Sequence, residues 1–222
     1  LQRRIIIMSI AASLAACGPT DPVSPEISSN PPASGTFHPP ALTTYSGRAT
    51  AVDATVKVLF ASITTRLGDT GPLPSDGGAL QASAITLTVP GVMSAGAAEG
   101  STTGGNRDAS SESSVANAAI AVGGVGITAS LLSSHSNANC LGGAPALGGS
   151  SNIADLEING EAILISGASN QTITLLDGLV QIVINEQTRT ANSIDVSALH
   201  VIVGGVTDVV VARTHSDITC GS

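Results

Sequence analysis

Apolar residues alternate with small polar residues over most of the chain after residue 45. The segment 48–58 alternates over its whole length, and 82–92 repeats the pattern. A period of two is typical of strands that bury one face. No segment after residue 45 combines a helical period with helix caps, and 58–67 is the only ambiguous one. The pattern predicts an all-β domain of roughly ten to twelve short strands.

Turn dipeptides separate several of these alternating runs. Asn-Gly at 159–160 lies between two apolar arms, which is the strongest short signal for a hairpin. Asp-Gly at 177–178 and Gly-Gly at 204–205 hold similar places. We therefore predict an antiparallel β-sandwich with hairpin turns. A β-solenoid is the alternative, because the small-residue run 108–122 is compatible with stacked coils.

Two segments about 80 residues apart in the chain resemble each other. Each contains Val-Gly-Gly-Val, at 122–125 and at 203–206, followed by a His and, five residues after it, a Cys. The pairs are His135 with Cys140 and His215 with Cys220. The similarity indicates that one type of hairpin is used twice.

The first 16 residues have the layout of a cleavable export signal. Arg3 and Arg4 form a basic start, and the apolar stretch 5–16 follows. A membrane-spanning helix needs roughly 20 apolar residues, so this stretch is too short to span. We predict that residues 1–16 are removed on export.

The end of this signal resembles the bacterial lipobox, with Leu14, Ala15 and Ala16 before Cys17. In that interpretation the sulfur of Cys17 carries the lipid, and cleavage makes Cys17 the new N-terminus. An ordinary secretory signal with a chance cysteine is the alternative. Since a single acyl chain binds a membrane only marginally, two or more chains on Cys17 would give a stable anchor.

A proline-rich segment follows the predicted lipid site. Seven of the eleven prolines lie in 18–44, where no hydrophobic period is visible. Such a composition favours an extended, semi-rigid tether. The chain is thus predicted to contain a signal peptide (1–16), a lipidated cysteine with its tether (17–44) and a β-domain (45–222).

Composition and charge restrict the partners. The 222 residues carry a net charge of −8, which becomes −10 once Arg3 and Arg4 are removed. This balance repels phosphate backbones and excludes nucleic acid as a partner.

The chain has no Trp, one Tyr and two Phe, so its core must consist of Val, Ile, Leu and Ala. The lack of aromatic platforms also argues against a lectin.

The two remaining cysteines, Cys140 and Cys220, are predicted to form a disulfide. Disulfides persist in exported proteins, and Cys17 is assigned to the lipid. Two free, buried thiols are the alternative.

The sequence carries no motif that assigns a catalytic or metal-binding site. The triplet Asp69-Thr70-Gly71 resembles that of aspartic proteases, but a second copy is lacking and a turn explains it better. His135 and His215 hold equivalent places, so a shared metal site is the weaker hypothesis. Nucleophile motifs and phosphate-binding loops are absent from the sequence. We therefore expect a non-enzymatic protein without cofactor or metal.

Several longer phrases resemble the choice-of-anchor P family. They are 69–83, 89–102, 113–124, 156–161, 183–188 and 198–222. The resemblance extends from about Gly47 to Ser222 and implies an exported bacterial domain that is joined to varied surface anchors. It implies no reaction, ligand or catalytic residue. Family members with a C-terminal sorting tail differ from this chain, where we expect the lipobox to supply the anchor.

Together these observations predict an exported protein of the bacterial cell envelope. A lipid on Cys17 would hold it to the membrane, facing the periplasm or the cell exterior, with a structural or adhesive role toward an envelope or extracellular partner. A module that binds a small ligand or a metal is the alternative. A hydrolase with an unfamiliar site is the third hypothesis.

Overall fold

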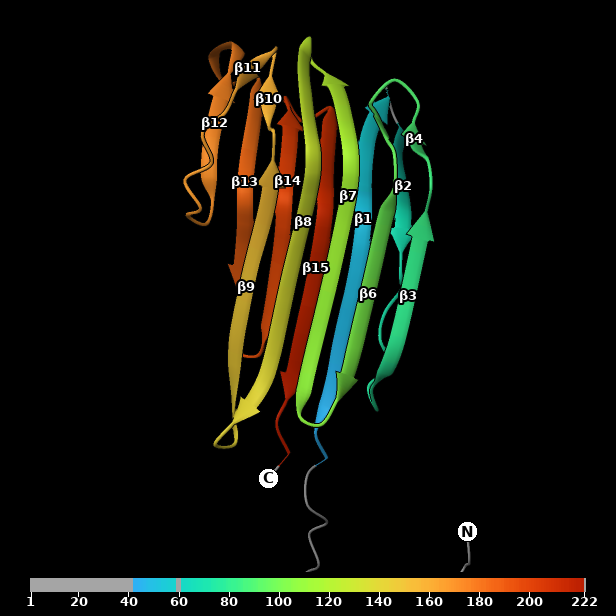
Figure 1. Ribbon diagram of the computed structural model, residues 1–222, viewed down its shortest axis with the longest axis vertical. Helices are drawn as coiled ribbons and strands as arrows, with labels where there is room; N and C mark the ends of the chain where they lie inside the picture. The colour runs from blue at the N-terminus through green and yellow to red at the C-terminus, as the bar shows by residue number, and fades with distance from the viewer. Residues whose placement is uncertain (1–41, 59–60, 222) are drawn as a thin grey trace, which may run out of the picture. The chain divides into compact units, whose positions relative to one another are not determined.

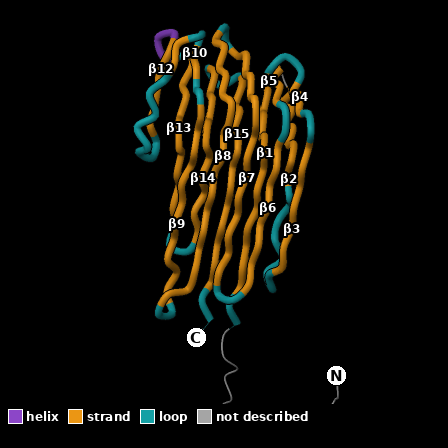
Figure 2. Tube along the Cα trace, viewed as in Figure 1, coloured by secondary structure: helices purple, strands orange, loops and turns teal. Residues whose placement is uncertain are grey.

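The described part of the protein is built almost wholly of β-strands. The computed structural model describes residues 42–58 and 61–221, so Leu14, Ala15, Ala16, Cys17 and most of the tether lie outside it. Fifteen strands and one 3-10 turn, η1 (Leu176–Gly178), make up its regular structure (Figure 2). The strands form two antiparallel sheets, which confirms the predicted all-β sandwich. Within these residues, no helix is long and apolar enough to cross a membrane.

Sheet A contains six strands in the order β12-β13-β14-β15-β1-β2. Their bounds are β1 (Thr44–Val58), β2 (Ala61–Asp69), β12 (Gln171–Leu175), β13 (Val180–Arg189), β14 (Ser193–Val203) and β15 (Thr207–Thr219). The first strand of the domain thus pairs with the last one in the middle of sheet A (Figure 1).

Sheet B contains nine strands around the long hairpin of β7 and β8. Their bounds are β3 (Gly78–Ala84), β4 (Leu87–Val89), β5 (Met93–Ala95), β6 (Ala98–Gly105), β7 (Asp108–Val122), β8 (Val125–Leu141), β9 (Ala144–Ala154), β10 (Glu157–Ile158) and β11 (Glu161–Ala162). Because β7 and β8 are so long, each pairs with one strand near one end and another near the other. β7 pairs with β6 and β5, and β8 with β9 and β10.

The two sheets pack face to face, with β7 and β8 over β1 and β15 (Figure 1). Their facing side chains are aliphatic over most of the interface, and Val115, Leu132, Ile182 and Val201 are fully buried. Branched aliphatic side chains fit a pleated surface that is buried on one side. The core therefore forms from Val, Ile, Leu and Ala, as the composition requires.

Strand number and length differ from the expectation of ten to twelve short strands. The run 108–122, which favoured a solenoid, is one continuous strand of sheet B, so the solenoid alternative is wrong. The ambiguous segment 58–67 lies mostly in β2 and contains no helix in its described residues. Asn159, with φ 53°, and Gly160, with φ 80°, form the predicted turn between β10 and β11.

A row of small residues interrupts the alternation across sheet A. The row lies across five neighbouring strands and consists of Gly68, Ala51, Ala212, Ala198 and Asn185. At these residues the regular pairing between neighbouring strands omits one residue pair. Gly68, Ala212 and Asn185 have positive φ angles of 59°, 51° and 53°. Such angles are costly for a residue with a Cβ atom. In each of these five strands, the inward-facing positions change by one residue at the row. The same face of sheet A therefore stays buried on both sides of it.

The internal similarity of the sequence corresponds to strands β8 and β15, which face each other across the sandwich. The hydroxyls of Ser136 and Ser216 meet at 2.8 Å, and both side chains are fully buried. Ser111 joins this cluster and donates to the carbonyl oxygen of His215 at 2.7 Å. Hydroxyls therefore link the two sheets at the end of the sandwich where the core is polar.

Candidate functional site

A shallow trough crosses the outer face of sheet B. It runs perpendicular to β3, β6, β7, β8 and β9 and has a volume of about 710 Å³. Its first wall is the row Gln81, Ser101, Glu112, His135 and Ser150, in which each residue is opposite the next on the neighbouring strand. Its second wall is the row Ser83, Glu99, Ser114, Ser133 and Asn152. We call this feature the sheet B trough.

The floor of the trough is formed by the residues between the two walls, whose side chains point into the sandwich. In a strand, successive side chains point to opposite faces, so the middle row leaves only backbone on the outside. A Cβ atom built on Gly100, a floor residue, would lie 3.3 Å from the Cβ of Ala49 in sheet A. Half of the wall residues are serines, and their short side chains leave the floor open.

Two carboxylates lie in the trough without a partner. Glu99 and Glu112 are exposed side chains on the neighbouring strands β6 and β7, diagonal to each other. Among the described residues, neither forms an ion pair or a side-chain hydrogen bond. His135, directly opposite Glu112, instead makes a 3.2 Å hydrogen bond with Ser110 through Nε2. The trough thus offers two free negative charges among neutral hydroxyls and amides.

The outer face of sheet A has a different character, because all of its acidic side chains except Asp217 are bonded to Arg or His side chains. Arg48 forms a two-point contact with Asp69, and Arg66 Nε donates to Asp53 at 2.9 Å. Asp195 accepts from Arg213 at 3.0 Å. A hollow of about 370 Å³ lies over these pairs. Its charges are largely satisfied within the protein.

The pKa values on sheet A reflect this pairing. The hydrogen bond from Arg48 is the main reason why the pKa of Asp69 is lowered. Burial would raise the pKa of Asp195, but hydrogen bonds from His215 and Arg213 outweigh it and lower that pKa. The pKa of Glu186 is lowered chiefly by its hydrogen bond with His200. These carboxylates are therefore held ionised, which suits ion pairing rather than proton transfer.

The two histidines of the repeated segments do not come together. His135 lies in the sheet B trough, whereas His215 contacts Asp195 at 3.1 Å on the outer face of sheet A. Their neighbours Ser136 and Ser216 meet inside, so alternation turns the histidines to opposite outer faces. The hypothesis of a shared metal site is therefore wrong. No group of three His, Cys, Asp or Glu residues in the described segments is arranged to hold a metal.

Asp69 of the Asp-Thr-Gly triplet has a structural environment. Besides Arg48, its carboxylate accepts from the Thr50 hydroxyl at 3.1 Å and from the Gly71 amide at 3.2 Å. These contacts close the turn after β2. The interpretation of the triplet as a turn agrees with this geometry.

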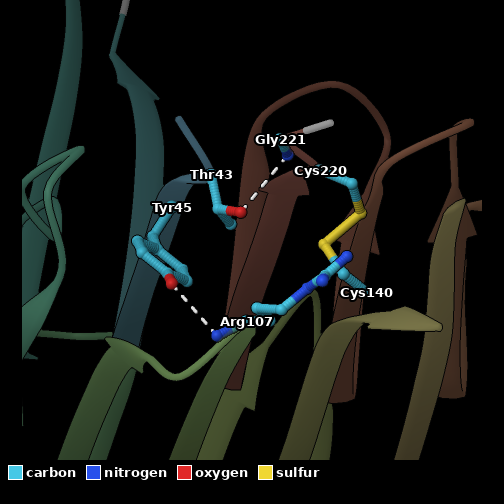
Figure 3. The surroundings of a disulfide bond; sticks show 6 residues. All are labelled: Thr43, Tyr45, Arg107, Cys140, Cys220 and Gly221. Atoms are coloured by element: carbon cyan, nitrogen blue, oxygen red, sulfur yellow. Dashed lines mark hydrogen bonds between the residues drawn. A yellow bond between two sulfur atoms is a disulfide. The ribbon is translucent and has the colours of Figure 1, made fainter. Parts of the chain in front are cut away.

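The cysteines paired in the sequence analysis lie at disulfide distance near the chain ends. Cys140 and Cys220 are bonded, with their Cα atoms 5.7 Å apart (Figure 3). Next to them, the Gly221 amide donates to the Thr43 hydroxyl at 3.2 Å. The chain therefore enters and leaves the sandwich at one end, where the disulfide joins β8 to the residue after β15.

Sequence reasoning missed Glu99 and Glu112. Their exposure could be predicted from alternation within each strand. Their proximity could not, because it depends on the register of β6 against β7. The serine-rich run 108–114, which contains Glu112, was the available signal for a polar outer face.

Comparisons with known proteins give little information on function. No family model matches the chain, and no curated protein matches it. Among solved structures, the chain is similar to Ail, the attachment invasion locus protein of Yersinia pestis, at 10% identity. The match covers 79% of this chain and 96% of Ail, with a TM-score of 0.15. At that score the similarity supports no conclusion, and the resemblance to the choice-of-anchor P family stays a prediction.

Proposed function

We propose that this chain is an exported, lipid-anchored protein of the bacterial cell envelope that displays a non-catalytic β-sandwich. Its role is structural or adhesive, toward the periplasm or the cell exterior. The anchor is the lipid on Cys17, and the segment up to residue 44 spaces the domain from the membrane. The choice-of-anchor P resemblance is consistent with this role.

One observation carries the proposal: the chain enters the sandwich at the end where its last strand also finishes. Thr43 contacts Gly221 there, and the disulfide closes the same end. A tether attached at this point leaves both outer faces and the opposite loops free. Such an arrangement suits display of the domain from a membrane.

The polar faces support a binding role over catalysis. On sheet A, five of the six acidic side chains contact Arg or His side chains, and the lowered pKa values of Asp69, Asp195 and Glu186 have these pairs as their cause. Active sites usually combine a perturbed titratable group with a nucleophile or a base in reach. The sheet B trough has two carboxylates without a partner. This feature favours a ligand-binding module over a hydrolase.

Metabolic labelling with a radioactive fatty acid tests the anchor. The wild type should incorporate label, and Cys17→Ser should not. A Cys140→Ser/Cys220→Ser double variant removes the other thiols and should still be labelled. Equal incorporation into wild type and Cys17→Ser would refute lipid anchoring. In intact cells, accessibility of the domain to an antibody then distinguishes the cell exterior from the periplasm.

A further inference from the structure

The two sheets divide the charges of the domain unequally. The strands of sheet A carry Arg48, Lys57, Arg66, Arg189 and Arg213, against six acidic residues. The described strands of sheet B carry five acidic residues and no Lys or Arg. The described strands of sheet B are therefore negative and carry no Lys or Arg of their own, and Arg107 lies outside them in the turn between β6 and β7. Charge complementarity favours a cationic partner on the outer face of sheet B.

Glu99 and Glu112 concentrate that charge in the sheet B trough. Residues that are diagonal on neighbouring strands lie within reach of one extended ligand. Around them, the walls carry serine hydroxyls and the side chains of Gln81 and Asn152. Serine hydroxyls and side-chain amides both donate and accept hydrogen bonds. The trough can therefore bind a chain of hydroxyl groups together with positive charges.

The direction of the trough distinguishes between linear ligands. It crosses five strands, a length of about 19 Å at the usual spacing between strands. Its floor is backbone whose N–H and C=O groups already pair within the sheet, so an extended peptide gains no ladder hydrogen bonds there. The trough also lacks deep apolar sites for side-chain anchors, whereas a sugar chain can bond to the walls with hydroxyls along its length. Among the described residues, no Phe, Tyr or Trp side chain lines the trough, so a sugar chain would be held by hydrogen bonds and charge and not by the aromatic stacking whose lack argues against an ordinary lectin.

We propose that the sheet B trough binds a linear glycan with free amino groups, such as a polymer of glucosamine. The ammonium groups would contact Glu99 and Glu112, and the sugar hydroxyls would bond to the serines of the walls. This ligand class deepens the function proposed above and rests on it for display of the domain outside the cytoplasm. Binding is weak per sugar and salt-dependent, because the charges are exposed.

Isothermal titration of the full-length protein in detergent tests this proposal. The probe is the glucosamine hexamer, titrated at about pH 6. The fully acetylated hexamer has the same length and lacks the charges, so it should bind at least about tenfold more weakly. A Glu99→Gln/Glu112→Gln variant should lose at least about tenfold in affinity for the glucosamine hexamer.

A matched control removes the same charge elsewhere on sheet B. Glu157→Gln/Glu161→Gln alters β10 and β11, outside the trough, and should bind like the wild type. Equal weakening in both double variants would overturn the site, since net charge alone would then explain binding. No binding of the glucosamine hexamer by the wild type would overturn the ligand class.

A lysine hexamer tests whether the trough prefers a glycan or a basic peptide. We expect it to bind at least about tenfold more weakly than the glucosamine hexamer, because it lacks hydroxyls for the serine walls. Equal or tighter binding of the lysine hexamer would overturn the assignment to a glycan. Fatty-acid labelling of Cys17 is independent of these titrations, so failure of the anchor and failure of the trough are distinguishable.

Discussion

The hydroxyl oxygens of Ser136 and Ser216 lie 2.8 Å apart, although 80 residues separate them and they belong to opposite sheets. Ser216 also donates to the carbonyl oxygen of Ser136 at 3.0 Å. Both side chains are fully buried, and among the described residues the Ser136 hydroxyl has Ser216 as its partner. This contact connects the two similar hairpins of the chain inside the sandwich, toward the end that the disulfide closes.

We expect Ser216→Ala to lower the free energy of unfolding by about 1–3 kcal/mol, because it leaves the Ser136 hydroxyl buried without its partner. The Ser136→Ala/Ser216→Ala double variant should lose less than the sum of the two single variants, since both polar groups are then removed. Unfolding in urea measures all three.

Ser113 and Ser134 provide the control for these three variants. They are buried opposite each other on β7 and β8 of sheet B, but their hydroxyls have no hydrogen-bond partner among the described residues. Ser113→Ala/Ser134→Ala should therefore leave stability unchanged or raise it. A loss equal to that of Ser216→Ala would contradict the role given to the hydroxyl contact.

Two adjacent glycines of β9 should respond differently to the same substitution. A Cβ atom on Gly149 would lie 2.6 Å from Ile194 Cδ1 and from Val196 Cγ2, whereas one on Gly148 meets nothing within 4 Å. Gly149→Ala should destabilise the protein by about 1–3 kcal/mol through overpacking. Gly148→Ala should be neutral or slightly stabilising, because alanine restricts the unfolded chain. Thermal unfolding of both variants checks the prediction, and similar melting temperatures would contradict it.

Loss of the disulfide should destabilise the domain strongly. Cys140 and Cys220 close a loop of 80 residues, for which chain entropy predicts about 4 kcal/mol. Unfolding in guanidinium, with and without reductant, measures the effect on the wild type. Cys17→Ser is the matched control and should unfold like the wild type. If reductant left the midpoint unchanged, the disulfide would have no role in stability.

Stability should depend on pH through His200, which lies between Glu186 and Asp208 at 3.0 Å from each. Burial opposes its charge, but Glu186 and then Asp208 outweigh burial and raise the pKa of His200. The stabilisation by protonated His200 is complete below the usual histidine pKa, about 6.5. It is lost as the pH rises through the raised value.

His200→Gln removes this contribution and allows its measurement. The stability difference between wild type and His200→Gln should be largest near pH 5.5 and should shrink toward pH 9. Urea unfolding at several pH values above 5 excludes the titration of the carboxylates, whose usual pKa values are about 4. A difference that stays constant with pH would show that His200 contributes by packing alone.

Local features of the chain were predictable where one strand or one turn decides them. Alternation over 48–58 and the Asn-Gly pair at 159–160 indicated strands and a hairpin, and the structure has both. The run 108–122 shows the limit of such reasoning. Its small residues fitted a solenoid equally well, because period-two alternation does not say which strands are neighbours.

The contents of each face depended on long-range register. His135 and His215 hold equivalent places in the sequence, yet they lie on opposite outer faces, because the facing strands β8 and β15 direct Ser136 and Ser216 inward. Glu99 and Glu112 are 13 positions apart and meet in one trough only through the pairing of β6 with β7. None of these relationships follows from spacing along the chain.

By itself the sequence determined the fold class, the polar and apolar sides of single strands and the turn at 159–160, because these depend on backbone preferences and side-chain alternation within a few residues. Only the tertiary structure decided which polar side chains share a face. Strand order and register are set by packing over the whole core, and they place the unpartnered Glu99 and Glu112 together on sheet B and the carboxylates paired with Arg or His on sheet A.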